Sequence, residues 1–104
     1  MLSYTMMDVQ LTLPSIIDRA NRLFPNREIV TKQPDGSLHR YTYADAHDRI
    51  CQLAHGLDEL GVSENGRIAT VAPNTFRHLE LYFAPACSGR SIHMCNPRLP
   101  AEHF

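Results

Sequence analysis

Apolar residues recur every three or four positions in three stretches of this sequence, which predicts three amphipathic helices. The first covers roughly residues 13–24, with Pro14 near its start, where a missing amide donor costs nothing. The second covers 43–60 and the third 75–88. The positions that define the three stripes are Ile16, Ile17, Ala20, Leu23 and Phe24; Ala46, Ile50, Leu53, Leu57 and Leu60; and Phe76, Leu79, Phe83 and Ala86.

Local signals place the ends of these helices. Thr42 and Asp45 have the spacing of a capping box, in which each side chain accepts a hydrogen bond from the backbone amide of the other residue. Gly61 suits the left-handed residue that follows a helix. Thr12 and Asn74 are the expected N-caps of the first and third helices.

A hairpin is predicted between the first two helices. Residues 28–31 are expected to form one short strand and residues 38–42 its return. The connecting segment 34–37, Pro-Asp-Gly-Ser, has turn chemistry, because glycine adopts a positive φ without steric cost.

The second half of the chain favours a βαβ unit. The almost wholly apolar run 68–72 is typical of a parallel strand covered on both faces, and 91–95 is the second strand, after the third helix. We therefore predict an α/β fold: a hairpin plus a parallel βαβ unit over 67–95, with three helices. Another helical turn is expected from Pro100 onward. Residues 1–11 have no clear periodicity and are expected to form a flexible lead-in to a domain that spans 12–104.

The composition argues against several classes of function. The 104 residues are 43% hydrophobic and 20% charged, which fits one small globular domain. The net charge of -1 gives no basis for nucleic-acid binding. Three cysteines without CxxC spacing favour neither a disulfide framework nor a zinc knuckle and fit a reducing cytoplasm. Neither a secretory signal nor a transmembrane segment is expected.

One row of metal-ligating side chains lies on the predicted second helix. His47, Cys51 and His55 follow one another at steps of four, and imidazole and thiolate are good zinc ligands. Eight residues span about 12 Å along a helix, too far for one ion to bind both histidines, and no fourth ligand is evident. We interpret the row as a polar flank of the helix and predict no metal site.

Other candidate groups also have simpler interpretations. A cluster of acids on the same helix is explained by solvation of its polar face: Asp45, Asp48, Asp58 and Glu59. The helix start at Asn74 could hold an anion, but the chain has no glycine-rich phosphate motif. Arg98 follows a predicted strand at the end where ligands gather in open α/β sheets. A surface arginine paired with an acid is the preferred interpretation of Arg98.

An ordered set of short motifs resembles the opening of medium- and long-chain fatty acyl-CoA ligases, members of the AMP-forming acyl-adenylate superfamily. The set comprises Glu28-Ile29-Val30, Asp35-Gly36, His39 to Ala44, Arg49, Leu53-Ala54, Leu60-Gly61-Val62, Asn74, Arg77 to Tyr82, Gly89, His93 and Asn96 to Leu99. The resemblance runs from about Leu11 to Phe104. The chain departs from the family pattern at four positions: Asn65-Gly66 in place of Gly-Asp, Pro73 in place of a common tryptophan, and Arg90 in place of a small residue.

The resemblance implies a reaction in two steps. A fatty acid carboxylate attacks ATP to give acyl-AMP and pyrophosphate, and the thiol of CoA then displaces AMP, with magnesium offsetting phosphate charge in the first step. The family's phosphate loop, its Tyr-x-x-Thr-Glu motif, its ribose-binding aspartate and its catalytic lysine are not in this chain. The resemblance therefore implies a partial N-terminal domain, and no catalytic, cofactor-binding or metal-binding residue is carried over.

The fragment is not expected to be active alone, although its family is one of ATP-dependent enzymes. Its expected partners are the remainder of the parent ligase or further copies of itself. The alternative is a stand-alone small α/β interaction module without catalysis. A small metal-binding protein is a third and weaker interpretation.

Overall fold

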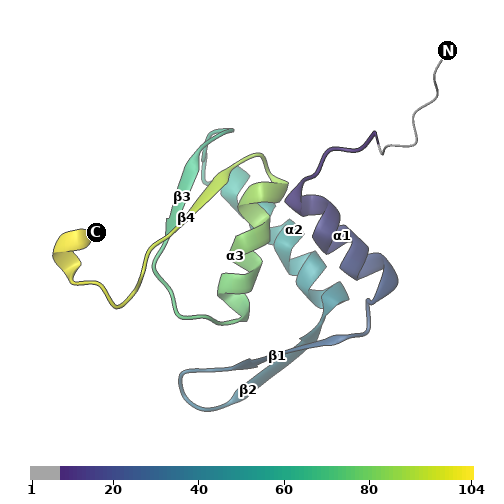
Figure 1. The fold of residues 1–104 in the computed structure, drawn as a ribbon, viewed down its shortest axis with the longest axis horizontal. Coiled ribbons are helices and arrows are strands. Elements are labelled where there is room, and N and C mark those ends of the chain that lie inside the picture. The colour runs from purple at the N-terminus through teal and green to yellow at the C-terminus, as the bar shows by residue number, and fades with distance from the viewer. Residues whose placement is uncertain (1–7) are drawn as a thin grey trace.

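Residues 8–104, which the computed structural model describes, form three α-helices and two small sheets (Figure 1). The predicted α/β class, with a hairpin, a βαβ unit and three helices, is confirmed. The elements in chain order are α1 (Leu13–Leu23), β1 (Glu28–Lys32), β2 (Leu38–Thr42), α2 (Tyr43–Glu59), β3 (Arg67–Thr70), α3 (Phe76–Cys87), β4 (Ser91–Met94) and the 3-10 turn η1 (Ala101–His103).

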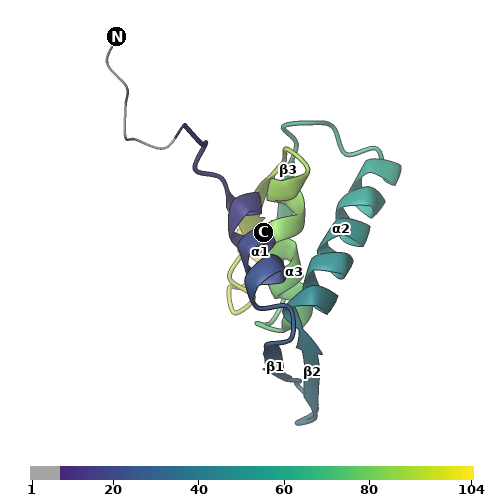
Figure 2. The ribbon, with the colours of Figure 1, turned by 90° about the vertical axis from the view of Figure 1, so that its right-hand side faces the viewer.

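The three helices pack against one another and stand over the hairpin, as Figure 2 shows. Their shared core joins Ile17 of α1, Ile50 of α2 and Ala84 of α3, all buried. A second buried cluster joins the hairpin to the helices through Tyr41 and Phe76, with Ala46 beside them. Of the helical stripes predicted from apolar spacing, Ile17, Ala46, Ile50, Leu57 and Phe76 are buried, whereas Ile16, Leu23, Phe24 and Leu60 are exposed.

The strand β2 passes into α2 without an intervening loop. Thr42 is the last residue of β2 and the N-cap of α2: its hydroxyl accepts from the amide of Asp45 at 3.2 Å. The Asp45 carboxylate accepts from the Thr42 amide at 3.0 Å, which completes the predicted capping box. These hydrogen bonds lower the pKa of Asp45, the one from the Thr42 backbone most of all. At the other end of the helix, Gly61 has the expected positive φ of 78°.

The expected caps of the other two helices are partly wrong. Thr12 occupies the N-cap of α1, but its hydroxyl makes no capping bond, and its carbonyl accepts from the Ser15 hydroxyl at 2.6 Å. Thr75, not Asn74, precedes α3. The helix begins later than predicted because the carbonyl of Thr75 is the acceptor for the amide of Leu79.

The hairpin forms with Glu28 opposite Thr42 and Lys32 opposite Leu38. Its turn has Gly36 at a φ of 88°, as the turn chemistry requires. The Asp35 carboxylate in this turn accepts from the hydroxyl and the amide of Ser37. Both hydrogen bonds, the hydroxyl's first, lower the pKa of Asp35.

The strands β3 and β4 pair in parallel, which confirms the predicted βαβ unit. However, β3 ends at Thr70, so the predicted strand 68–72 extends two residues too far at its C-terminal end. Thr70 is buried beneath α3, where its hydroxyl lies 3.0 Å from the imidazole of His78. Ala69 on the opposite face is exposed, and Val71 is 56% exposed. Within residues 8–104, α3 is the helix that mainly contacts this sheet, and much of the opposite face is open.

The two ends of the chain add little to the packing. Residues 8–12 form neither helix nor strand, and positions 1–7 of the predicted lead-in lie outside the described residues. The expected helical turn after Pro100 is the short η1. None of the helices within residues 8–104 has the length and apolar character needed to cross a membrane.

The capping box predicts a specific loss of stability. Replacing Thr42 by Ala should lower the free energy of unfolding by about 1 kcal/mol, because the amide of Asp45 loses its acceptor. The matched control is Thr12→Ala, which removes an N-cap side chain that makes no capping bond and should change stability by under about 0.5 kcal/mol. Urea unfolding followed by circular dichroism measures both. Equal losses in the two variants would contradict the assigned cap.

Candidate functional site

The predicted row of metal-ligating side chains does not form a cluster. His47 is held by Asp18 of α1, with its Nε2 3.2 Å from the Asp18 Oδ1. Cys51 and His55 are exposed on α2. Within residues 8–104, no group of three or more histidine, cysteine, aspartate or glutamate side chains could hold a metal ion. The row is thus a polar flank of α2, and one member of it ties α2 to α1.

The acids on the second helix have different roles from one another. Asp48 and Glu59 are exposed, as solvation of a polar face predicts. Asp45 belongs to the capping box, whereas Asp58 forms an ion pair with Arg90. Solvation alone therefore explains two of these four acids.

Arg98 lies in the loop after β4 and is exposed. Its backbone amide donates to the Asn96 side-chain oxygen at 3.0 Å, which shapes the loop. No ion pair in the part of the chain that the structure describes includes Arg98. The preferred interpretation, pairing with a neighbouring acid, is therefore not observed.

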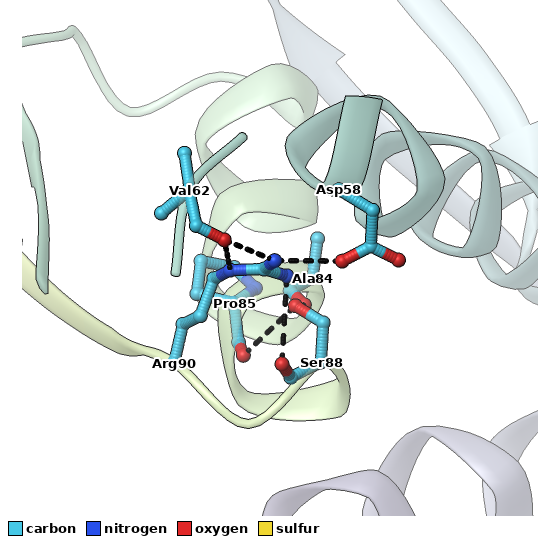
Figure 3. A network of polar contacts seen from close by, with 6 residues as sticks. All are labelled: Asp58, Val62, Ala84, Pro85, Ser88 and Arg90. Carbon is cyan, nitrogen blue, oxygen red and sulfur yellow. Dashed lines mark hydrogen bonds and ion pairs between the residues drawn. The ribbon is translucent and has the colours of Figure 1, made fainter. Parts of the chain in front are cut away.

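The most highly connected polar side chain is Arg90, which the sequence marked only as a departure from the family pattern. Figure 3 shows its guanidinium between the ends of α2 and α3. The Nη2 donates to the Asp58 carboxylate and to the Val62 carbonyl, each at 2.6 Å, and the Nε donates to the same carbonyl at 3.2 Å. The Nη1 donates to the carbonyl of Ser88 at 3.4 Å. The side chain is only 4% exposed.

The chemistry of helix ends explains this position. The last carbonyls of a helix have no partner within it and carry partial negative charge, which favours a cation. Ser88 is the C-cap of α3, and its hydroxyl donates to the carbonyls of Ala84 and Pro85 at 2.8 and 3.2 Å (Figure 3). Arg90 satisfies the Ser88 carbonyl and, beyond the end of α2, the Val62 carbonyl. A side chain at the start of β4 thus joins both helix ends.

A second buried ionic group ties the hairpin to α2 and α3. Glu80 is 4% exposed and accepts from the Tyr41 hydroxyl at 3.2 Å. Arg49 of α2 donates to both of its carboxylate oxygens. Burial, and next the Glu80 carboxylate, raise the pKa of Tyr41 well above its usual range, so its hydroxyl stays protonated as a donor. The arginine also lies over Phe76, 5.6 Å from the ring centre.

One hollow among the described residues is mostly apolar. It has a volume of about 240 Å³ and lies between the three helices and β1. Ile17, Ala20, Ile29 and Phe83 are among its walls, and no charged side chain lines it. A hollow of this kind suits apolar groups, because Tyr43 is the only residue in its lining with a polar side-chain atom.

The buried charges of Arg90 and Glu80 are engaged by other parts of the chain and hold the fold together, and no charged side chain lines the apolar hollow. That this chain contributes no catalytic, cofactor-binding or metal-binding residue stays a prediction.

Comparison with protein families and curated sequences gives one consistent result. The family described as AMP-binding enzyme matches residues 17–104. The long-chain-fatty-acid--CoA ligase of Thermus thermophilus is 45% identical over 100 residues, which cover 96% of this chain and 18% of that protein. The medium-chain-fatty-acid--CoA ligase of Ectopseudomonas oleovorans is 36% identical over 99 residues, covering 95% and 18%.

A solved structure from Rhodopseudomonas palustris, assigned as a long-chain-fatty-acid CoA ligase, has the same arrangement with a TM-score of 0.73 and 34% sequence identity. The match covers 88% of this chain and 22% of that one. The chain thus spans about a fifth of the length of the relatives it matches.

The Arg90 network predicts that lysine cannot replace this arginine. Arg90→Lys should cost about 2 kcal/mol of unfolding free energy, because an ammonium cannot donate in the same planar geometry to Val62, Ser88 and Asp58. The control Arg98→Lys replaces an exposed arginine and should be nearly neutral. Chemical denaturation of the two variants tests this, and a stability of Arg90→Lys equal to that of the parent chain would contradict it.

The dispersed ligands predict that zinc does not stabilise the fold. A thermal melt should be the same with and without a strong chelator, because His47, Cys51 and His55 form no cluster with other ligands. His47→Ala serves as the comparison, since it removes the Asp18 contact in both conditions. A melting temperature that falls by many degrees on chelation would show that a metal is bound.

Proposed function

Since the chain belongs to the AMP-binding enzyme family and is a partial piece of an AMP-forming ligase, we propose that its parent enzyme joins a fatty acid to CoA. The reaction would consume ATP and release AMP and pyrophosphate. The observation that carries this proposal is 45% identity, over 96% of the chain, to a long-chain-fatty-acid--CoA ligase. The match to a medium-chain-fatty-acid--CoA ligase supports the same substrate class.

ATP, magnesium and CoA belong, in this proposal, to the whole ligase and not to this chain. Neither the apolar hollow nor Arg90, whose guanidinium is engaged by Asp58 and Val62, offers a site for the nucleotide. The phosphates of ATP need donors and cations that are free to meet them. Residues 12–104 would then act as a structural part of the N-terminal domain, with the chemistry supplied by the remaining sequence.

A cytoplasmic location completes the proposal. The three cysteines at positions 51, 87 and 95 are unpaired thiols, as expected in a reducing compartment. The remainder of the ligase is the proposed partner inside the cell. When the chain is present alone, we propose that it associates with further copies of itself, because apolar side chains are exposed beside the βαβ sheet: Val71, Met94, Leu99 and Phe104.

A chimera tests the proposed function. In the Thermus thermophilus enzyme, the segment that matches this chain is replaced by this chain, and pyrophosphate release is measured with ATP, magnesium, CoA and a fatty acid. The chimera should be active, whereas the isolated chain should release no pyrophosphate above a no-protein control. The matched control is the Thermus enzyme with that segment deleted, which should be inactive.

Two results would contradict these expectations. Turnover by the isolated chain that survives repeated purification would show that it contains a catalytic site. A chimera that folds, binds ATP and yet leaves the fatty acid unchanged would show that this segment does not belong to a fatty acyl-CoA ligase.

A further inference from the structure

The outer edge of β4 has unpaired backbone groups. The amides of Ser91 and Cys95 donate to Gly66 and Thr70 at 2.9 and 2.8 Å, so these residues point their backbone groups toward β3. Successive residues of a strand point their amide and carbonyl groups to alternate sides. The backbone groups of Ile92 and Met94 therefore point away from β3, toward the free edge.

This edge lacks the charges that protect the other edges of the molecule. Natural sheets guard exposed edges with charged residues, proline or bulges, because an unguarded edge pairs with other chains. The strand β1 carries Glu28 and Lys32, and β3 carries Arg67. The sequence of β4 is Ser-Ile-His-Met, with no acid, lysine, arginine or proline. Of the edges in the described part of the chain, that of β4 is the least protected.

Little of the described chain covers this sheet. Figure 1 shows α3 on one side of the β3–β4 pair, and the segment that leads to η1 on the other. His93 and Met94 are exposed, the latter at 48%. A two-stranded pair is marginal alone, and this chain leaves about four-fifths of each relative's sequence unspanned.

We propose that the isolated chain forms a symmetric dimer in which β4 pairs antiparallel with β4 of a second copy, giving a continuous sheet across both molecules. This inference rests on the self-association proposed above and names its surface. In the register that uses both outward residues, Ile92 of one copy lies opposite Met94 of the other, and each such pair exchanges two backbone hydrogen bonds.

The same register places His93 of one copy directly opposite His93 of the second. Such a non-hydrogen-bonded pair brings the two side chains to roughly 5 Å. No like charges face each other elsewhere along Ser91–Met94, because this strand has no acid, lysine or arginine. A permanent charge at position 93 would meet its own copy, which destabilises the pairing.

Light scattering coupled to size exclusion over a dilution series tests the dimer. The unsubstituted chain of 104 residues should dissociate reversibly from dimer to monomer on dilution. His93→Lys should weaken the dimer about fivefold or more, because it places two ammonium groups opposite each other. The matched control His55→Lys introduces the same charge at an exposed position on α2 and should leave the dissociation constant unchanged.

Residue-level amide exchange gives a second measurement that does not depend on the variants. The amides of Ile92 and Met94 should exchange more slowly in a concentrated solution of the unsubstituted chain than in a dilute one. The exchange rates of the Ser91 and Cys95 amides should not change with concentration, because β3 already protects them.

Each outcome has a definite meaning. If the unsubstituted chain is monomeric at every concentration, both the proposed self-association and the proposed pairing through β4 are overturned. If the His93→Lys dimer has the same dissociation constant as the dimer of the unsubstituted chain, only the pairing through β4 is overturned. Rapid amide exchange at Ile92 and Met94 within the dimer would have the same meaning. The proposed ligase function is judged separately, by the activity of the chimera.

Discussion

The buried guanidinium of Arg90 is the interaction on which the second half of this fold depends. It connects the segment after α2, the end of α3 and the start of β4. A charge that is 4% exposed is tolerable only because every face of it meets a carbonyl or a carboxylate. Asp58, which is itself largely exposed, adds charge balance, while the carbonyls of Val62 and Ser88 fix the position of the side chain.

Much of the local structure could be predicted because its causes are local. The capping box of Thr42 and Asp45, the positive φ of Gly61 and the hairpin turn at Gly36 each depend on neighbours within a few positions. The predicted N-cap at Asn74 is wrong because either Asn74 or Thr75 could be the last residue of the loop before α3. Which of them becomes the cap depends on the backbone acceptor that the helix uses first, here Thr75.

The polar interior could not be predicted in the same way. Arg49 lies 31 positions from Glu80, and Arg90 lies 28 positions from Val62, so no local pattern marks these pairs. Their residue types are ordinary for a surface and gain meaning only once the helices pack. The function could not be predicted from the candidate site for a different reason. The buried charges stabilise the fold, and the proposed reaction depends on the rest of a ligase. Similarity along the chain is informative there, whereas the geometry of residues 8–104 is not.

The separation between Val62 and Arg90 also sets an order of assembly. A chain is synthesised from its N-terminus, and local contacts form before distant ones. The hairpin and α2 can form while later residues are still being added, because their hydrogen-bond partners are already present. The carbonyl of Val62 must remain hydrated until Arg90 arrives, 28 positions later. The joint between the two halves therefore closes only after Arg90 has been added, so α2 is complete before it is fastened to the start of β4.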